Sequence, residues 1–446
     1  MGKYFGTDGI RGKANVDLDA YRAFQVGRYL GYYYSQEGKQ KIVIGKDTRI
    51  SSDMLENALA SGIASQGCDA YLVGYCSTPV VCHLAVNEDF ICGAMISASH
   101  NPYYDNGIKV FSKDGIKLPS EIEDKIEAFI DGEVDLEYAT DDKVGSIYSY
   151  KEGLDHYIDW ITKEFPLDLS DMKLALDCAN GSASYTAERS LSKLGASLSI
   201  INNEPNGTNI NNGCGSTHPE GLQAIMKGSD YDLGLTFDGD ADRQILVDND
   251  GELINGDYML YICGKHYRDL GILTNNTVVS TVMANLGLFK ALEKEGIKVE
   301  QTAVGDKYVY EKMCEDDDIV GGEQSGHIIF KRHATTGDGL LTALAILEIM
   351  KQTGESIKEL KEGLKIYPQL LVNVKVTDKN SVLNDEDVQK AIEEVNKNLE
   401  GNGRLLVRPS GTEPLLRVMA EAETDEICER EVNKIADIIR EKYGAE

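Results

Sequence analysis

The first 150 residues alternate between short apolar runs and stretches with helical periodicity. A helix is predicted over residues 51–67, which begin with serines suited to an N-cap and end in a glycine. Its apolar positions Leu55, Leu59 and Ile63 fall on one face. Short apolar strands separated by such helices predict a mainly parallel sheet covered on both faces. The predicted strands are KIVIGKD (41–47), CDAYLVGY (68–75) and FICGAMISAS (90–99).

The same alternation returns twice further along the chain. Residues 173–178 form an apolar strand before a Gly/Ser loop and a helical stretch at 185–195, and residues 232–237 form another strand. A third round begins near residue 277 and closes with a helix predicted over residues 339–354. No strict sequence repeat is visible, so the repetition is one of architecture.

The last part of the chain has a different pattern. Its predicted elements are a strand at 368–376, a helix within 385–403, strands at 404–410 and 415–423, and a final helix. This β-α-β-β-α order is typical of a small α+β domain. We therefore expect an α/β protein with three similar mixed-sheet α/β domains and a smaller C-terminal α+β domain. The expected domain bounds are 1–150, 151–255, 256–367 and 368–446.

Composition and charge narrow the range of partners. The 446 residues are 42% hydrophobic, enough for several packed cores. Lys and Arg total 45 against 74 Asp and Glu, for a formal net charge of −29. A field of that sign repels nucleic acid and anionic membranes, but a local basic pocket can still bind a small anion.

Several features favour a cytoplasmic protein. No run of about 18 apolar residues is present, so no membrane span is expected. The first residues, MGKYFGTDGIRG, lack the hydrophobic region of a signal peptide. The nine cysteines form no C-x-x-C pair, and several lie in apolar segments. They are typical of buried thiols in a reducing compartment.

The stretch ISASHNPYYDNGIKVF (96–111) places Ser99 directly before His100. A serine beside a histidine suggests a hydrolase nucleophile and its base. Adjacent residues point in different directions, however, and the partners of a catalytic triad are normally distant in sequence. A G-x-S-x-G elbow is also absent. We therefore expect His100 to be poorly placed to deprotonate Ser99, and a purely structural loop is the alternative.

The stretch FDGDADR (237–243) places Asp238, Asp240 and Asp242 at alternate positions after an apolar strand. Three carboxylates this close repel one another unless a cation lies among them, and hard oxygen ligands suit Mg²⁺ or Ca²⁺. An EF-hand would need Gly and Glu where this chain has Arg243 and Asn249. The sequence therefore favours a metal site of another kind over a solvated acidic turn.

Two further loops are rich in polar groups. In GGEQSGH (321–327), Glu323 and Ser325 can reach the hydroxyls of a sugar, although a glycine-rich turn explains the pattern equally well. RPSGTEPLLR (408–417) combines two arginines, two hydroxyls and the amides of a glycine turn, which suit phosphate oxygens. A Walker A loop is absent. Together the four loops indicate phosphoryl transfer on a phosphorylated sugar, without a nucleotide site.

These four loops, in this order, resemble those of the α-D-phosphohexomutases, and the resemblance covers essentially the whole chain. The segment NNGCGSTHPE (211–220) is most similar to members that act on glucosamine phosphates. The other stretches that carry the resemblance are FGTDGIRG (5–12), SASHNPYYDNGIK (97–109), GGEQSGHII (321–329) and TTGDGLLTAL (335–344). The resemblance implies four domains around a central cleft.

It also implies a reaction. Phosphorylated Ser99 would complete the coordination of one Mg²⁺ per chain, held by Asp238, Asp240 and Asp242. Ser99 would pass its phosphoryl group to O1 of glucosamine 6-phosphate. After glucosamine 1,6-bisphosphate reorients, Ser99 would take the phosphate from O6 and leave glucosamine 1-phosphate, a precursor for amino-sugar nucleotides and cell wall. Glucosamine or glucose 1,6-bisphosphate would serve as primer.

The resemblance assigns roles to the remaining residues. His100 and His327 would order their loops, with catalysis by His327 left open. A surface position for Lys109 and a local carboxylate partner for Arg11 are also left open. The implied sets are Lys109, Arg11 and Arg243 for charge and proton transfer, Glu323, Ser325 and His327 for the sugar, and Arg408, Ser410, Gly411, Thr412 and Arg417 for the phosphate that does not react.

Two alternatives stay open. The first is a phosphoglucomutase or phosphomannomutase of the same family, with the same site. The second is a non-catalytic sugar-phosphate sensor, against which the intact Ser99 and the three aspartates argue. Sugar phosphates are the expected partners in each case, nucleic acid and membranes are not, and a homodimer is left open.

Overall fold

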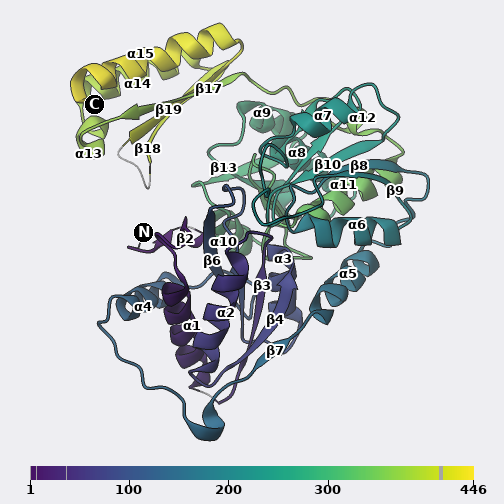
Figure 1. The fold of residues 1–446 in the computed structure, drawn as a ribbon. Helices are drawn as coiled ribbons and strands as arrows, with labels where there is room; N and C mark the ends of the chain where they lie inside the picture. The colour runs from purple at the N-terminus through teal and green to yellow at the C-terminus, as the bar shows by residue number, and fades with distance from the viewer. Residues whose placement is uncertain (1, 7, 37, 411–414, 446) are drawn as a thin grey trace. The chain divides into compact units, whose positions relative to one another are not determined.

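The computed structural model describes residues 2–6, 8–36, 38–410 and 415–445 (Figure 1). The chain forms two compact units. The first comprises Met1–Met283 and Ile297–Glu362, and the second Ala284–Gly296 and Gly363–Glu446. Over the described residues, no helix has both the length and the hydropathy that crossing a bilayer requires.

The largest sheet of the first unit has the strand order β1-β2-β6-β5-β3-β4-β7. Strands β5, β3, β4 and β7 pair in parallel, but β1, β2, β6 and β5 pair antiparallel. The expectation of a mainly parallel sheet is therefore wrong for this half, because β6 returns beside β5 without a helical crossover. The strands are β1 Phe5–Gly6, β2 Gly9–Lys13, β3 Lys41–Lys46, β4 Asp69–Tyr75, β5 Cys92–Ile96, β6 Asp105–Ser112 and β7 Ile147–Ser149.

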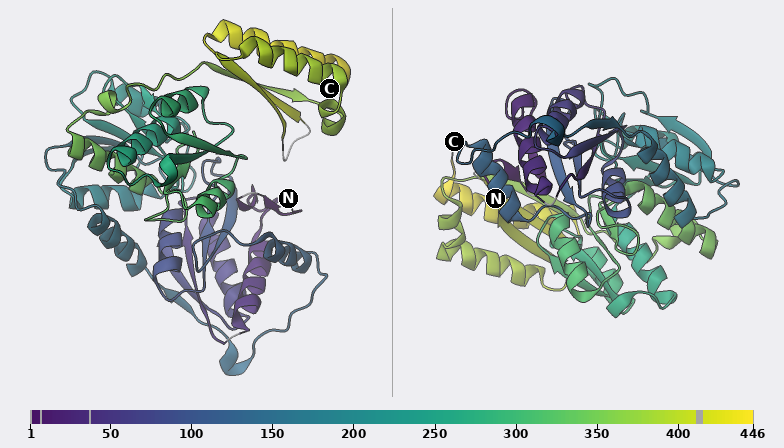
Figure 2. Two further views of the ribbon diagram at one scale, coloured as in Figure 1. Left: turned by 180° about the vertical axis from the view of Figure 1, so that it is seen from behind. Right: turned by 90° about the horizontal axis from the view of Figure 1, so that it is seen from below.

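Helices cover this sheet and close its core. Figure 1 and Figure 2 show α1 and α2, in purple, side by side against it. Leu30 of α1 and Leu59 of α2 are fully buried in one core with Ile44 of β3. Ser51 precedes α2, but its hydroxyl accepts a hydrogen bond from Asn106 at 2.8 Å instead of capping the helix. The helices are α1 Ala20–Ser35, α2 Ser52–Ala64, α3 Thr78–Asn87 and α4 Ser120–Ile130, with a 3-10 turn at Asp141–Lys143.

A second sheet has the order β12-β11-β10-β8-β9. Strands β10, β8 and β9 are parallel neighbours, and β11 and β12 extend the sheet antiparallel. The strands are β8 Lys173–Asp177, β9 Ser197–Ile201, β10 Leu233–Phe237, β11 Gln244–Val247 and β12 Leu253–Ile254. The helices of this part of the chain are α5 Glu152–Glu164, α6 Ala183–Lys193 and α7 Glu220–Met226.

A third sheet has the order β14-β13-β15-β16, of which β15 and β16 are antiparallel. Its apolar helix α11 is buried along almost its whole length, as the continuous apolar run of its sequence predicts. The strands are β13 Thr277–Thr281, β14 Lys298–Thr302, β15 Val320–Gly322 and β16 Ile328–Phe330. The helices are α8 Gly256–Asp269, α10 Asp306–Asp316, α11 Gly339–Thr353 and α12 Ile357–Leu360, with a 3-10 turn at Thr274–Asn276.

The second unit is an antiparallel sheet of order β17-β19-β18. Helices α14 and α15 pack together on one face of it, as Figure 1 and the left-hand view in Figure 2 show. From β17 on, the order of elements matches the predicted α+β pattern with the short helix α13 in addition, and α9 joins the unit from an earlier part of the chain. The elements are α9 Leu286–Lys294, β17 Gln369–Lys375, α13 Lys379–Leu383, α14 Glu386–Leu399, β18 Gly403–Pro409, β19 Leu415–Ala422 and α15 Asp425–Tyr443.

All four candidate loops occupy the same kind of position. Each joins two antiparallel neighbours: β5 and β6, β10 and β11, β15 and β16, or β18 and β19. In the first three loops, polar side chains therefore lie at the turn of a hairpin, and the strand that returns can carry a second functional group back into the sheet.

The close packing of α1 on α2 generates the first prediction. A Cβ on Gly62 would overlap the backbone carbonyl of Phe24, and alanine otherwise favours a helix by only about 1 kcal/mol. We expect Gly62→Ala to lower the free energy of unfolding by about 1–3 kcal/mol, because the clash is with backbone. Denaturant unfolding measures this.

The control is Gly221→Ala in α7, where a Cβ would have Ile201 Cδ1 as its nearest neighbour at 3.9 Å. This variant should be as stable as the wild type or slightly more so. Unchanged stability of Gly62→Ala would mean that the two helices do not touch there.

Candidate active site

Ser99 lies buried in the loop between β5 and β6 and contacts the acidic loop of the second sheet. Its hydroxyl donates a hydrogen bond to Asp238 Oδ2 at 2.6 Å, across 139 positions of sequence. Ser99 has a φ of 51°, in the left-handed region that a non-glycine residue rarely adopts. Such strain persists only where surrounding contacts hold it.

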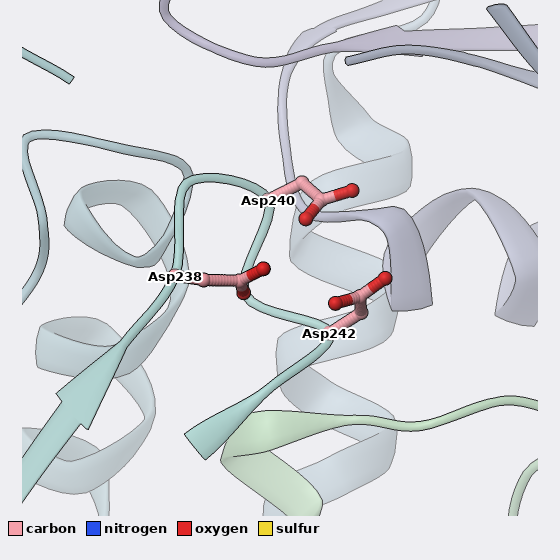
Figure 3. Close-up of side chains that lie close together, drawn as sticks. All are labelled: Asp238, Asp240 and Asp242. Atoms are coloured by element: carbon pink, nitrogen blue, oxygen red, sulfur yellow. The ribbon is translucent and has the colours of Figure 1, made fainter. Parts of the chain in front are cut away.

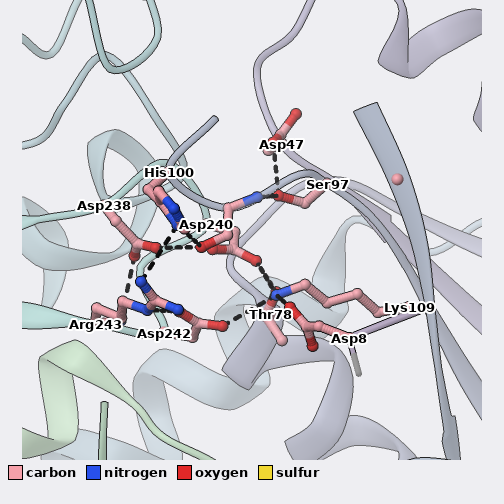
Figure 4. Close-up of polar contacts among 12 residues, drawn as sticks. Asp8, Asp47, Thr78, Ser97, His100, Lys109, Asp238, Asp240, Asp242 and Arg243 are labelled. Carbon is pink, nitrogen blue, oxygen red and sulfur yellow. Dashed lines mark hydrogen bonds and ion pairs between the residues drawn. The ribbon is translucent and has the colours of Figure 1, made fainter. Parts of the chain in front are cut away.

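Four side chains supply those contacts. The Ser99 N–H donates to Ser97 Oγ at 2.9 Å, and Ser97 in turn donates to Asp47 at 2.7 Å (Figure 4). The Ser99 carbonyl accepts from Arg49 Nη2 at 2.8 Å and from Asn211 Nδ2 at 2.9 Å. Arg49 is fully buried and paired with Asp47 at 2.8 Å. Sequence reasoning missed Asp47 and Arg49, although Asp47 ends a predicted strand and Arg49 comes two residues later.

His100 is closer to Ser99 than its adjacency suggested. Its Nδ1 lies 3.4 Å from Ser99 Oγ, so the expectation that the two side chains diverge is wrong. The left-handed backbone at Ser99 brings the imidazole back over the serine. Burial, with Arg243 and Arg11, lowers the pKa of His100 to about 4. The same Nδ1 lies 3.2 Å from Arg243 Nη1. The imidazole is therefore a neutral, weak base, unlike the histidine of a hydrolase.

The three aspartates of the acidic loop form a buried cluster. Figure 3 shows Asp238, Asp240 and Asp242 converging, and one oxygen of each lies within 4.8 Å of the others. Burial, reinforced by the two neighbouring carboxylates, raises the pKa of Asp238 well above its usual range. Among the described residues, Asp240 Oδ1 and Asp242 Oδ1 are buried without a hydrogen-bond partner. Such oxygens fit a hard divalent cation.

Lys109 is part of this cluster. It lies on β6 with 2% of its side chain exposed, so the surface alternative is wrong. Its Nζ is 2.7 Å from Asp240 Oδ2 and 3.0 Å from Asp242 Oδ2. Although burial lowers the pKa of Lys109, the carboxylates raise it well above its usual value. Thr78 also donates to Asp240 at 2.6 Å.

The two predicted arginines have different surroundings. Arg243 donates its backbone N–H to Asp238 Oδ1 at 3.2 Å, and its side chain reaches His100 (Figure 4). Arg11, on β2, forms an ion pair with Asp8, so it does have the nearby carboxylate partner that the sequence allowed as an alternative. Asp8 Oδ2 also lies 3.3 Å from Lys109 Nζ. Sequence reasoning missed Asp8, although it belongs to the FGTDGIRG stretch.

The turn between β15 and β16 brings part of the sugar-loop set to the same region. His327 is buried, its Nε2 accepts from the Gly337 N–H at 2.9 Å, and its Nδ1 lies 3.8 Å from Asp242 Oδ1. Glu323 accepts from the Gly305 N–H at 3.1 Å, and Ser325 is exposed. Loops from all three sheets of the first unit therefore meet around the aspartates.

The phosphate-clamp residues belong to the second unit. Arg408 on β18 and Arg417 on β19 are direct cross-strand partners. Burial and the charge of Arg417 lower the pKa of Arg408. Like charges directly opposite one another destabilise a sheet, and an anion between them would remove that penalty. Ser410 is buried, whereas Gly411 and Thr412 lie outside the described residues.

Comparison with known proteins gives one consistent result. Models of the phosphoglucomutase/phosphomannomutase family match their α/β/α domain I to residues 2–136, domain II to 155–251, domain III to 255–367 and the C-terminal domain to 371–438. Relatives named phosphoglucosamine mutase from Anoxybacillus flavithermus and Bacillus subtilis are 51% and 50% identical, with 100% of each chain covered.

Structural comparison agrees. A phosphoglucomutase/phosphomannomutase family protein from Burkholderia thailandensis matches with a TM-score of 0.80 at 25% identity. The match covers 98% of this chain and 97% of that one. The likeness therefore extends over all four matched segments.

The buried aspartates generate the second prediction. A cation that binds the folded chain but not the unfolded one stabilises it by about 2.7 kcal/mol at 100 times its Kd. We expect Mg²⁺ to raise the melting temperature of the wild type and to leave that of Asp240→Asn nearly unchanged. Asp250→Asn, at an exposed position just beyond β11, is the control and should respond like the wild type. Equal shifts in all three proteins would argue against the site.

Proposed function

This chain belongs to the phosphoglucomutase/phosphomannomutase family, and we propose that it interconverts glucosamine 6-phosphate and glucosamine 1-phosphate. Identity of about half the residues over the full length to proteins named phosphoglucosamine mutase supports the choice of sugar. The observation that carries the chemistry is the 2.6 Å hydrogen bond from Ser99 Oγ to Asp238. It puts a buried hydroxyl against a cluster of carboxylates suited to a divalent cation.

Ser99 is proposed to carry the phosphoryl group that is exchanged. In the first step the bond from phosphorus to Ser99 Oγ breaks and a bond to O1 of glucosamine 6-phosphate forms, giving glucosamine 1,6-bisphosphate. In the second step, after the sugar has turned, the bond from the other phosphorus to O6 breaks and a bond from that phosphorus to Ser99 Oγ forms, leaving glucosamine 1-phosphate. The proton lost by each attacking hydroxyl is regained by the oxygen that leaves, so no other reactant is consumed.

Asp238, Asp240 and Asp242 are proposed to hold one Mg²⁺, which when bound would offset charge on the transferring group. Arg243 and Arg11 add positive charge beside Ser99. Lys109 is protonated at neutral pH because of its carboxylate neighbours, so it suits proton donation to the departing oxygen better than proton abstraction. Arg49, Ser97 and Asn211 hold the serine in its strained conformation.

Binding of the sugar phosphate is proposed to involve two further groups of residues. Glu323, Ser325 and His327 would contact the sugar, since they share one turn and His327 is adjacent to Asp242. Arg408, Ser410 and Arg417 would bind the phosphate that does not react, because two opposed guanidinium groups suit its oxygens. Gly411 and Thr412 are proposed for the same role from the sequence alone.

The test of this function is a side-by-side assay of glucosamine, glucose and mannose 6-phosphates, with Mg²⁺ and glucose 1,6-bisphosphate as primer. We expect the highest kcat/KM with glucosamine 6-phosphate. A much higher value with the glucose or mannose compound would assign the chain to another activity of the family. Ser99→Ala should lose turnover by at least about 10⁴-fold yet still bind sugar phosphate. Binding without turnover by the wild type would favour a sensor.

The opposed arginines lead to a separate prediction. Arg417→Ala should raise KM for glucosamine 6-phosphate by about 10–100-fold, because a charge-assisted hydrogen bond contributes roughly 1.5–3 kcal/mol. The phosphorylation of Ser99, read by intact-protein mass spectrometry, should be unaffected. Arg430→Ala is the control, since that arginine lies on α15 with 67% of its side chain exposed. An unchanged KM for Arg417→Ala would remove it from the clamp.

A further inference from the structure

A closed circuit of ionisable side chains passes through Asp242 at the edge of the aspartate cluster, and part of it has no role in the chemistry proposed above. Lys117 Nζ lies 2.7 Å from Asp8 Oδ1 on one side and 2.7 Å from Asp306 Oδ1 on the other. Asp306 Oδ2 lies 3.7 Å from the ring of His327. Through Asp8 and His327 the circuit reaches the buried residues already described, Lys109 and Asp242.

Lys117 belongs to the segment between β6 and α4, next to the sheet that carries Ser99. Only 13% of its side chain is exposed, and 20% of that of Asp306. An exposed ion pair contributes little, but removing one partner of a mostly buried pair leaves an uncompensated charge, which is costly. The lysine therefore holds together two carboxylates, one from the turn between β1 and β2 and the other from the start of α10.

Asp306 connects this lysine to the sugar loop. It is the first residue of α10, and the residue before it, Gly305, has a φ of 131° that only glycine readily adopts. In that conformation the Gly305 N–H donates to Glu323 Oε1 at 3.1 Å. The position of Glu323 thus depends on where α10 begins, and Lys117 holds that end of α10.

We propose that Lys117 and Asp306 are positioning residues. They fix the start of α10 and, through the Gly305 N–H, hold the Glu323 carboxylate where it can contact the sugar. The inference rests on the proposed function. It adds that two residues outside the loop that contacts the sugar help to set the affinity for the sugar. The pair acts through the Gly305 N–H and Glu323, and neither residue touches the reacting atoms.

The test compares Asp306→Asn and Lys117→Met with the wild type. Asp306→Asn retains the shape of the side chain but loses the charge that holds Lys117. We expect Kd and KM for glucosamine 6-phosphate to rise about tenfold, since small displacements of a positioned group have effects of this size or larger. Its kcat should fall less than threefold. Lys117→Met should show the same rise in KM with a larger loss of kcat, because Asp8 is then free to shift beside Lys109 and Arg11.

Further measurements separate positioning from a general loss of structure. Lys117→Arg should restore KM to within about threefold of the wild type, because arginine can bridge both carboxylates. The rise in melting temperature with Mg²⁺ should be the same in Asp306→Asn as in the wild type. Lys113→Met is the matched control, an exposed lysine on the same segment, and should leave KM unchanged.

The outcomes distinguish the two proposals. Unchanged Kd and KM in Asp306→Asn, in a protein whose wild type binds and converts glucosamine 6-phosphate, would overturn the inference alone. A lower melting temperature with normal KM, or a failure of Lys117→Arg to restore KM, would also overturn it. A wild type that neither binds nor converts glucosamine 6-phosphate would overturn the proposed function first.

Discussion

The repulsion among three buried carboxylates is the constraint on which the first unit depends. Asp238, Asp240 and Asp242 follow one strand, and burial alone would drive them apart or neutralise them. The groups that offset their charge come largely from the other side of the contact, where Ser99, Thr78 and Lys109 belong to the first sheet. The acidic loop of the second sheet is therefore buried by contacts with the first sheet. The same contacts that pack the two sheets together also assemble the site.

Because the loops are hairpin turns, residues that are close in sequence can reach the same site. Ser99 lies at the turn between β5 and β6, and Lys109 returns along β6 to the same cluster only ten positions later. Arg243 stands at the end of the turn between β10 and β11, where its N–H reaches Asp238. A buried hydroxyl and the charged groups beside it can thus come from one pair of strands. A helical crossover would carry the second group away from the site before the chain returned.

The sequence predicted most helices and strands correctly, but it gave little information on which side chains contact one another. Apolar runs and helical faces located most strands and the acidic loop, because these signals are local. The antiparallel β6 was not predicted, since its apolar residues continue directly from the Ser99 loop. His100 was misjudged because the left-handed φ of Ser99 depends on Arg49 and Asn211, which are distant in sequence. The same holds for Lys117: its partners become neighbours only after the sheets pack.

Each unit brings side chains of like charge close together, negative in the first unit and positive in the second. The first gathers carboxylates whose free oxygens suit a cation, and the second places Arg408 directly opposite Arg417, which suits an anion. A chain of net charge −29 would repel a sugar phosphate at long range. At physiological ionic strength, however, exposed charges are screened beyond about 8 Å, so local charges decide binding. Within its own unit, each cluster therefore favours a small ion of the opposite charge, whatever the net charge of the whole chain.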